Sequence, residues 1–339
     1  MKNELNFLHV VRLTLILFFF IPLIMHHFFS SSKINSKLKN NKTKQITKEI
    51  ISPDRIKVYN VKNDTIFEIN FEDYIIGVLS GEMPASYELE ALKAQAVAIR
   101  SYVLDKIINF NKQNYLCKHN GAHICTDPGH CEAYLSQEDA NNKWGKDWTK
   151  KYFDKIMQAV LETKSEYMIC EGEVVKAFFF ALSGGGTEFA SDIWGGKNYP
   201  YLKPVQSKFD KNSPNFLSEK KLSVNDFKKK LKLLRPEIKE LCDSKISLNN
   251  IKKTTYGSVR EITFNNENFK GEEIRNTFNL RSTNFEITIN DDCITFLVKG
   301  HGHGVGMSQY GANYLAKNGK NYKEILRYYY NGISFSHLN

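Results

Sequence analysis

The chain has 339 residues, a formal net charge of +10 and 42% hydrophobic residues. This length is sufficient for a substantial core, and the basic balance suits an anionic cell wall or membrane surface. No zinc-finger, helix-turn-helix or RNA-recognition pattern occurs, so we predict no nucleic-acid binding.

Residues 7–29 form a mostly apolar run with only Arg12 charged inside it, which is long enough for one membrane span. A cleaved signal peptide is the alternative, but no A-x-A-like cleavage site follows the run. The lysines after the run would, by the positive-inside rule alone, place the N-terminus outside. However, an anchor with a short basic head and a long C-terminal domain is usually exported with that domain outside. We therefore interpret the run as an uncleaved signal anchor.

This interpretation divides the chain into four parts. Residues 1–6 are a short cytoplasmic N-terminus, and 7–29 are the transmembrane anchor. Residues 30–48 are rich in Lys, Asn and Ser without an apolar period, which predicts a flexible linker. Residues 49–339 mix apolar and polar residues as a globular domain does, and they form the predicted extracytoplasmic domain.

The first part of this domain alternates like paired strands over 56–71, with a turn at Asn63-Asp64, and 71–79 predicts a helix. Ser86 is a candidate N-cap for a long central helix, because apolar residues recur at helical spacing from Leu89 to Val103.

Later segments mix both types of element. Residues 218–242 are Lys-rich, amphipathic and broken at Pro236, which is consistent with an inserted helical lobe. Residues 257–264, 285–289 and 294–298 alternate as strands. Because helices and strands interleave without regular βαβ repeats, we predict an α+β fold with the long helix packed against antiparallel strands.

Glu82 lies in Gly81-Glu82-Met83-Pro84, before the long helix, on what we interpret as a connecting segment. Apolar neighbours would raise its pKa toward the range of a general acid, whereas the helix N-terminus would favour the anion. A Glu that only hydrogen-bonds backbone at the helix entrance is the alternative. On the helix itself, Lys93 and Arg100 could bind an anionic or hydroxyl-rich ligand, and a solvated charged face is the alternative.

A cysteine- and histidine-rich segment follows the long helix. Its potential ligands are Cys117, His119, His123, Cys125, His130 and Cys131. Such ligands on a loop with Gly and Pro suit tetrahedral zinc, whereas disulfides, the alternative, would give the histidines no role. We favour His119, Cys125, His130 and Cys131, a closed shell that predicts structural zinc. Asn120 replaces the Glu of an HExxH motif, which disfavours a zincin.

The segment 300–312 reads GHGHGVGMSQYGA. Its four alternating glycines predict positive φ angles or a very close backbone approach. Ser308 is a candidate N-cap for a helix over 309–317. The loop thus brings two imidazoles, a hydroxyl and an amide to a helix start, and a tight structural turn is the alternative.

Taken together, these motifs resemble the SpoIID family of stage II sporulation proteins, also called the amidase-enhancer family. The matching segments run in family order and span most of the domain. They are 81–84, 90–98, Arg100, 183–185, 194–195, 201–202, 280–282 and 300–312.

The resemblance implies a peptidoglycan lytic transglycosylase that cuts denuded glycan strands during engulfment of the forespore, in the septal space beside the mother cell. It implies that Glu82 is the catalytic residue, and that the partners are the amidase SpoIIP and the membrane protein SpoIIM. The proposed zinc ligands resemble a Cys/His site of clostridial members. On this reading, Glu82 protonates the glycosidic oxygen and then accepts the proton of the muramoyl 6-hydroxyl, so one carboxylate suffices. No second carboxylate stands near it in a motif.

We hypothesise that the Gly-rich loop forms the opposite wall of a glycan groove, with His303, Ser308 and Gln309 near the sugar. Two other functions remain open at this stage. One is a non-enzymatic activator of a cell-wall amidase, and the other is a zinc-dependent cell-wall hydrolase.

Overall fold

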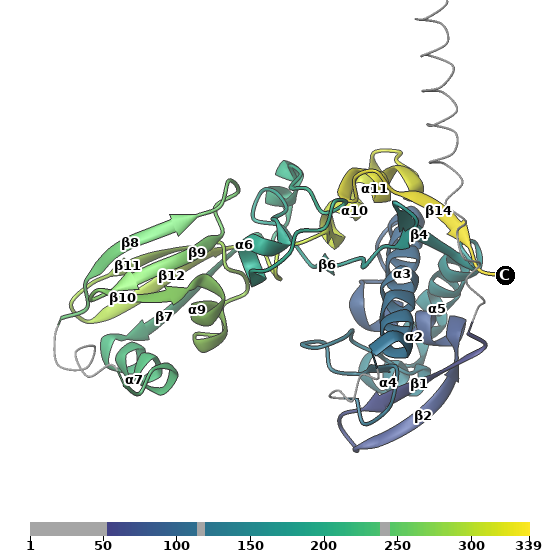
Figure 1. Ribbon diagram of the computed structural model, residues 1–339, viewed down its shortest axis with the longest axis horizontal. Helices are drawn as coiled ribbons and strands as arrows, with labels where there is room; N and C mark the ends of the chain where they lie inside the picture. Colours follow the sequence, from purple (N-terminus) through teal and green to yellow (C-terminus); the bar gives the residue numbers. More distant parts are fainter. Residues whose placement is uncertain (1–52, 114–118, 238–244) are drawn as a thin grey trace, which may run out of the picture. The chain divides into compact units, whose positions relative to one another are not determined.

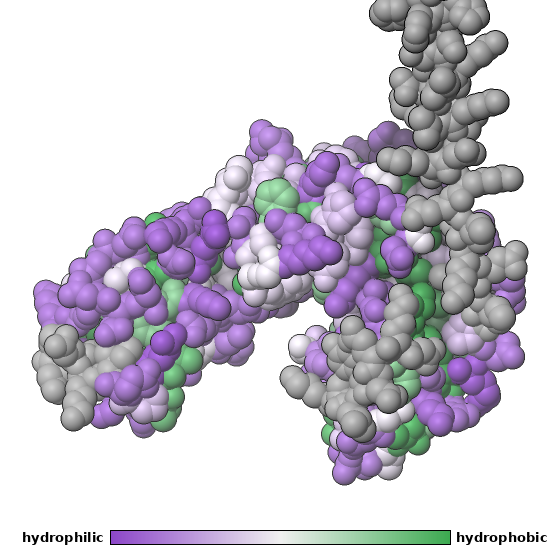
Figure 2. Space-filling view, viewed as in Figure 1, coloured by the Kyte–Doolittle hydropathy of each residue, from purple (hydrophilic) through white to green (hydrophobic). Residues whose placement is uncertain are grey.

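The computed structural model describes residues 53–113, 119–237 and 245–339. The predicted anchor at 7–29 and linker at 30–48 lie outside these residues, as does Cys117. Within the described ranges, no helix has both the length and the apolarity needed to cross a bilayer. Hydrophilic side chains predominate on the face of these residues that Figure 2 presents.

The predicted hairpin and first helix are confirmed. β1 (Arg55–Asn60) and β2 (Thr65–Asn70) pair antiparallel, and Asp64 in the turn has a φ of 54°. The Asn70 side chain then accepts hydrogen bonds from two backbone N–H groups and caps α2 (Phe71–Glu82). α2 runs three residues beyond its predicted end, so Glu82 is its last residue rather than part of a connecting segment.

The long helix α3 (Leu89–Gln113) lies at the centre of the first hydrophobic core (Figure 1). It begins later than predicted, because the Glu88 carbonyl, not Ser86, accepts the first backbone hydrogen bonds. Fully buried alanines on α3 allow close packing. Its neighbours are α2, α5 (Lys146–Leu161), β4 (Glu166–Cys170), α10 (Gln309–Lys317) and α11 (Tyr322–Tyr329).

Short elements complete this part of the molecule. β4 pairs antiparallel with β5 (Glu173–Val174) and β14 (Ser334–His337), β3 (Ile124–Cys125) pairs parallel with β1, and β6 (Phe179–Phe180) pairs parallel with β13 (Met307–Ser308). The helical segments are α4 (Gln137–Trp144), α6 (Ala190–Trp194) and the 3₁₀ turn at Lys208–Asn212. The long helix therefore packs on other helices and on an antiparallel sheet, and the α+β class is confirmed.

A second hydrophobic core, rich in phenylalanine, belongs to the segment 217–299. Two antiparallel sheets form it, in the orders β10-β9-β8 and β11-β12-β7, and α7 and α9 pack against their strands (Figure 1). The bounds are β7 (Leu217–Ser223), α7 (Val224–Leu234), β8 (Leu248–Lys253), β9 (Val259–Phe264), β10 (Glu267–Lys270), α9 (Gly271–Thr277), β11 (Phe285–Ile289) and β12 (Cys293–Lys299).

The predicted helical lobe is thus a mixed lobe. The amphipathic pattern predicts α7 correctly, with Phe227 and Leu231 fully buried. However, Leu217–Ser223 is a strand, because it supplies a row of hydrogen bonds along the free edge of β12. A pairing of this kind depends on a partner about seventy residues away in sequence, which helical periodicity does not reveal.

Arg100 is a fully buried charge beside the first core. Its side chain is 0% exposed and makes a bidentate pair with Glu72 of α2, at 3.0 and 2.7 Å. A third nitrogen donates to the Glu166 carbonyl of β4 at 2.9 Å. Arg100 therefore ties α2, α3 and β4 together, and we assign it no contact with a substrate.

We expect Arg100→Met to destabilise the protein by about 3–5 kcal/mol, because it leaves Glu72 in a largely buried position without its counter-ion. Urea unfolding measures this loss. The matched control is Arg260→Met, whose exposed pair with Asp192 at 3.4 Å should be worth less than about 1 kcal/mol. Equal losses for the two variants would show that the buried pair is not a stability determinant.

Candidate active site

A pocket of about 480 Å³ lies where α2, the Cys/His segment, residues 177–181 and the Gly-rich loop meet, and this volume is within the usual range for ligand pockets. Its lining includes Glu82, Glu132, His303 and Gln309, together with Arg275 from α9 of the second core. Sequence segments that are more than two hundred residues apart thus converge on one cavity.

Glu82 reaches this pocket from the C-terminal end of α2. Burial is the largest influence on its carboxyl and raises the pKa above 4.5. The Ala133 N–H and the nearby Gln309 amide act in the opposite direction and lower this pKa by less. The C-terminal end of a helix also disfavours an anion, so the helix dipole raises the pKa of Glu82 further, in the same direction as burial. The sequence-based expectation of a helix N-terminus beside Glu82 is therefore wrong, because α2 continues to this residue.

The backbone of Ala133 holds the Glu82 carboxylate in place. Its N–H donates to Glu82 Oε1 over 2.6 Å. This contact requires a glycine at position 81, because a Cβ there would lie only 2.7 Å from the Ala133 carbonyl oxygen. The Gly-Glu pair of the motif therefore has a physical reason: glycine lets the Cys/His segment approach, and that segment then orients the acid.

Glu132 is a second carboxyl in the same pocket, which the sequence analysis did not identify. It is 2% exposed, and neither of its oxygens has a hydrogen-bond partner among the described residues. Burial, and then the charge of Glu82, raise its pKa well above the usual range. The expectation of a solitary carboxylate is therefore wrong for the folded chain, because Glu132 follows Cys131 on a loop whose course the sequence does not indicate.

The Gly-rich loop has the predicted backbone. Gly300, Gly302, Gly304 and Gly306 all have positive φ angles, between 78° and 110°. At Gly306 a Cβ would lie 1.9 Å from the Phe178 carbonyl oxygen, so the loop also makes the predicted close approach. This contact places the loop directly beside residues 178–180, which form the adjoining wall of the pocket.

Of the three loop residues predicted to bind substrate, His303 and Gln309 line the pocket and Ser308 does not. Burial and the charge of Arg275 lower the pKa of His303 to about 4, so its imidazole is neutral at pH 7. The Gln309 amide is close enough to Glu82 to lower the pKa of that carboxyl, but its buried Nε2 makes no hydrogen bond of ordinary length and angle with a described residue. Such an unpartnered donor is available to a ligand.

Ser308 has a structural role instead. It is the predicted N-cap of α10, accepting from the Gly311 N–H at 3.2 Å, and its hydroxyl donates to buried Asp210 at 2.9 Å. Lys93 is likewise engaged, in ion pairs with Glu90 and Glu162 and over the ring of Tyr322. Neither residue lines the pocket, so we assign neither a contact with substrate.

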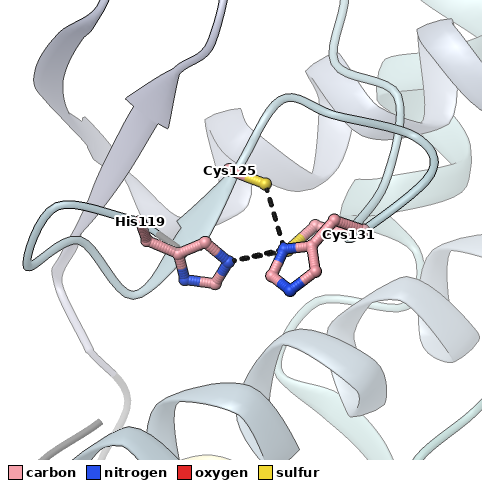
Figure 3. A group of neighbouring side chains, drawn as sticks. His119, Cys125 and Cys131 are labelled. Atoms are coloured by element: carbon pink, nitrogen blue, oxygen red, sulfur yellow. Dashed lines mark hydrogen bonds between the residues drawn. The ribbon is translucent and has the colours of Figure 1, made fainter. Parts of the chain in front are cut away.

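The four predicted metal ligands form one cluster beside the pocket. The donor atoms of His119, Cys125, His130 and Cys131 all lie within 4.8 Å of one another. Figure 3 shows the side chains of His119, Cys125 and Cys131 directed toward one another. Both cysteines are free thiols, so the disulfide alternative does not apply to them.

The donor set fits a tetrahedral metal. A zinc ion with ordinary Zn–N and Zn–S bonds holds its ligand atoms roughly 3.3–3.8 Å apart. The His119 Nε2 atom lies 3.0 Å from His130 Nδ1 and 3.3 Å from Cys131 Sγ, and His130 Nδ1 lies 3.5 Å from Cys125 Sγ. The hydrogen bond between the two thiols lowers the pKa of Cys125 and raises that of Cys131, so without a metal only Cys125 is favoured as a thiolate. The cluster can therefore hold a metal ion, with no position left open for water.

Tyr102 and Arg275 also line the pocket and were not predicted from the sequence. Tyr102 faces the pocket from α3, in a helical row that is indistinguishable from ordinary core positions. Arg275 comes from a lobe with its own core, so only the tertiary structure brings it to Glu82. No local motif marks either residue.

Comparisons with known proteins show what the chain is similar to. The family model of the stage II sporulation proteins, SpoIID, matches residues 59–169, which include Glu82 and all four Cys/His residues. The stage II sporulation protein D of Bacillus amyloliquefaciens is 35% identical over 84% of this chain and 79% of its own. Its counterpart in Bacillus subtilis is 35% identical over 84% and 80%. The amidase enhancer of Bacillus subtilis is 28% identical over 77% of this chain and 40% of its own.

We expect Glu82→Gln to stabilise the protein at neutral pH. A raised pKa means that the stability contributed by protonated Glu82 is present below about pH 4.5 and is lost as the pH rises through its folded pKa. The advantage of the variant should therefore be small at pH 4 and grow toward pH 8, as measured by urea midpoints. Exposed Glu88→Gln is the control. A pH-independent difference for Glu82→Gln would contradict the raised pKa.

Proposed function

Because the chain belongs to the SpoIID family of stage II sporulation proteins, we propose that it is a peptidoglycan lytic transglycosylase that cleaves denuded glycan strands. The observation that carries the proposal is a carboxyl whose pKa burial raises, held by a backbone N–H at the wall of a pocket. A general acid of this kind must keep its proton near neutral pH until the leaving group needs it.

In the proposed reaction, Glu82 gives its proton to the glycosidic oxygen as the bond to the muramoyl anomeric carbon breaks. The 6-hydroxyl of the same muramoyl unit then attacks that carbon, and the Glu82 carboxylate accepts the hydroxyl proton. The product is a 1,6-anhydro ring, and no water is consumed. The Ala133 N–H supports the carboxylate between the two proton transfers, because it donates to Oε1 and favours the ionised form.

Glu132 gives a specific reason to consider hydrolysis as a second candidate. Glycoside hydrolases generally use a pair of carboxyl groups, and Glu132 supplies a second one in this pocket. However, burial and then the charge of Glu82 raise the pKa of Glu132 well above its usual range, which favours the neutral carboxyl, a poor base or nucleophile. We therefore favour the route that needs only Glu82.

We propose that the metal ion is zinc, with a structural role. The two nitrogens and two sulfurs form a closed ligand set that zinc prefers. The same segment continues from Cys131 through Glu132 to Ala133, whose N–H orients Glu82. Holding this segment in place would thus affect catalysis without any chemistry at the metal, which disfavours a zinc-dependent hydrolase.

By the same family membership, we propose that the chain is anchored in the membrane by residues 7–29, with its catalytic domain in the septal space between mother cell and forespore. The expected partners are the amidase SpoIIP and the membrane protein SpoIIM. The similarity to an amidase enhancer supports a partnership with an amidase. An activator without enzymatic activity remains the main alternative.

Glycan cleavage tests the proposal directly. We expect the wild-type domain to release 1,6-anhydromuramoyl fragments from amidase-treated glycan, and Glu82→Gln to slow this release roughly 10²- to 10⁴-fold. Glu88→Gln should retain full activity. Mass spectrometry distinguishes the anhydro product from a hydrolysed one, which is heavier by one water. Reducing ends would establish the hydrolase, and stimulation of an amidase without any cleavage would establish the activator.

Metal removal tests the structural role. We expect Cys125→Ser or Cys131→Ser to lose the bound zinc, to unfold at a lower urea concentration and to lose most of the cleavage activity, because the Ala133 segment is released. Cys293→Ser changes a free, half-buried cysteine at the start of β12 and should have none of these effects. Full activity in a zinc-free wild-type protein would contradict the proposal.

A further inference from the structure

Among the described residues that line the pocket of Glu82, Arg275 is the only lysine or arginine. It projects from α9, a helix of the second core, whereas Glu82 and Glu132 belong to the first part of the chain. The pocket therefore combines two carboxyl groups from one part of the chain with one guanidinium from another.

The guanidinium of Arg275 is half-buried and has no hydrogen bond or ion pair with any described residue. Glu272, three residues earlier on α9, influences it electrostatically, but the Trp194 side chain hydrogen-bonds this carboxyl. Arg235 provides the contrast, since it pairs with Glu273 of the same helix at 2.9 Å. Glu272 is therefore only a partial counter-charge for this half-buried cation, and a bound anion would reduce the remaining cost of burying the guanidinium.

The neighbouring groups are also arranged to favour an anion. Burial, and then the charges of Arg281 and Arg275, lower the pKa of His301, while burial and then Arg275 lower the pKa of His303 to about 4. Both shifts favour the neutral imidazole. Arg281 lies next to His301, with 3.4 Å between Nη2 and Nδ1. Two guanidiniums, those of Arg275 and Arg281, therefore act on the histidine side of the pocket, where Glu272 is the carboxyl that acts on Arg275.

The proposed substrate carries a matching anion. Each muramic acid residue bears a lactyl side chain, which ends in an amide bond as long as a stem peptide is attached. Removal of the peptide by an amidase converts that amide into a free carboxylate. A planar guanidinium binds a carboxylate through two parallel hydrogen bonds, and a neutral amide cannot replace this interaction.

We propose that Arg275 binds the lactyl carboxylate of a muramic acid residue and thereby selects strands whose stem peptides have been removed. This inference rests on the proposed transglycosylase function and adds a residue that determines its specificity. A strand that still bears peptides would leave Arg275 half-buried without a hydrogen-bonded carboxylate, so discrimination arises from an incompletely neutralised charge as well as from a favourable contact.

Binding to chemically matched glycans tests the inference. The protein is the metal-loaded domain carrying Glu82→Gln, so that the glycan stays intact. The ligands are denuded strands with free lactyl carboxylates and the same strands with those carboxylates converted to methylamides. Titration calorimetry then gives Kd for each ligand with Arg275 and with Arg275→Gln, Arg275→Lys and the surface control Arg260→Gln.

We expect the carboxylate strand to bind roughly 10- to 100-fold more tightly than the methylamide strand. Arg275→Gln should abolish this preference by weakening only the carboxylate complex, Arg275→Lys should retain part of it, and Arg260→Gln should retain all of it. High salt should reduce the preference.

Equal affinity for the two strands overturns the inference, and this comparison needs no substitution at Arg275. An equal loss of both affinities in Arg275→Gln also overturns it, because it assigns Arg275 a structural role. A cleavage assay with the protein that retains Glu82 distinguishes failure of the Arg275 inference from failure of the proposed function. If that protein cleaves both strands equally, the inference fails and the transglycosylase stands, whereas failure to bind or cleave either strand refutes the proposed function itself.

Discussion

The hydrogen bond from the Ala133 N–H to Glu82 is the contact on which the rest of the site depends. It fixes one oxygen of a carboxyl whose pKa is raised by burial, at a helix end that also disfavours the anion. The donor belongs to a segment with only a two-residue strand of its own, so regular structure does not hold it. The Cys/His cluster and the absence of a side chain at Gly81 set its position instead.

The Gly-rich loop completes the pocket from the other end of the sequence. Its approach to Phe178 brings His303 and Gln309 to the wall formed by residues 178–180. The second core then contributes Arg275 through α9. The positions of these parts depend on close contacts at Gly81, at Gly306 and in the Cys/His cluster. Among its described lining residues, the pocket combines two carboxyl groups, neutral polar groups and one guanidinium.

Sequence patterns predicted the features with local causes. Helical spacing identified α2 and α3, alternation identified β9, β11 and β12, and the glycine repeat identified the positive φ angles near His303. These patterns failed for residues whose positions are determined by tertiary structure. Arg100 looked like a surface ligand but is buried against Glu72, and Glu132 and Arg275 carry no local signal because the fold alone brings them to Glu82.

The central claim is that the Cys/His segment holds Glu82 as a buried acid, and a ¹³C titration of the Glu82 carboxyl tests it most directly. The side-chain signal would be assigned with Glu82→Gln and Glu132→Gln and followed in metal-loaded and chelator-treated protein. The account predicts a pKa above 4.5 in the loaded protein and a return toward 4.5 once the metal is removed, since the released segment admits water. An unshifted pKa in the loaded protein, or one that is indifferent to the metal, would contradict it.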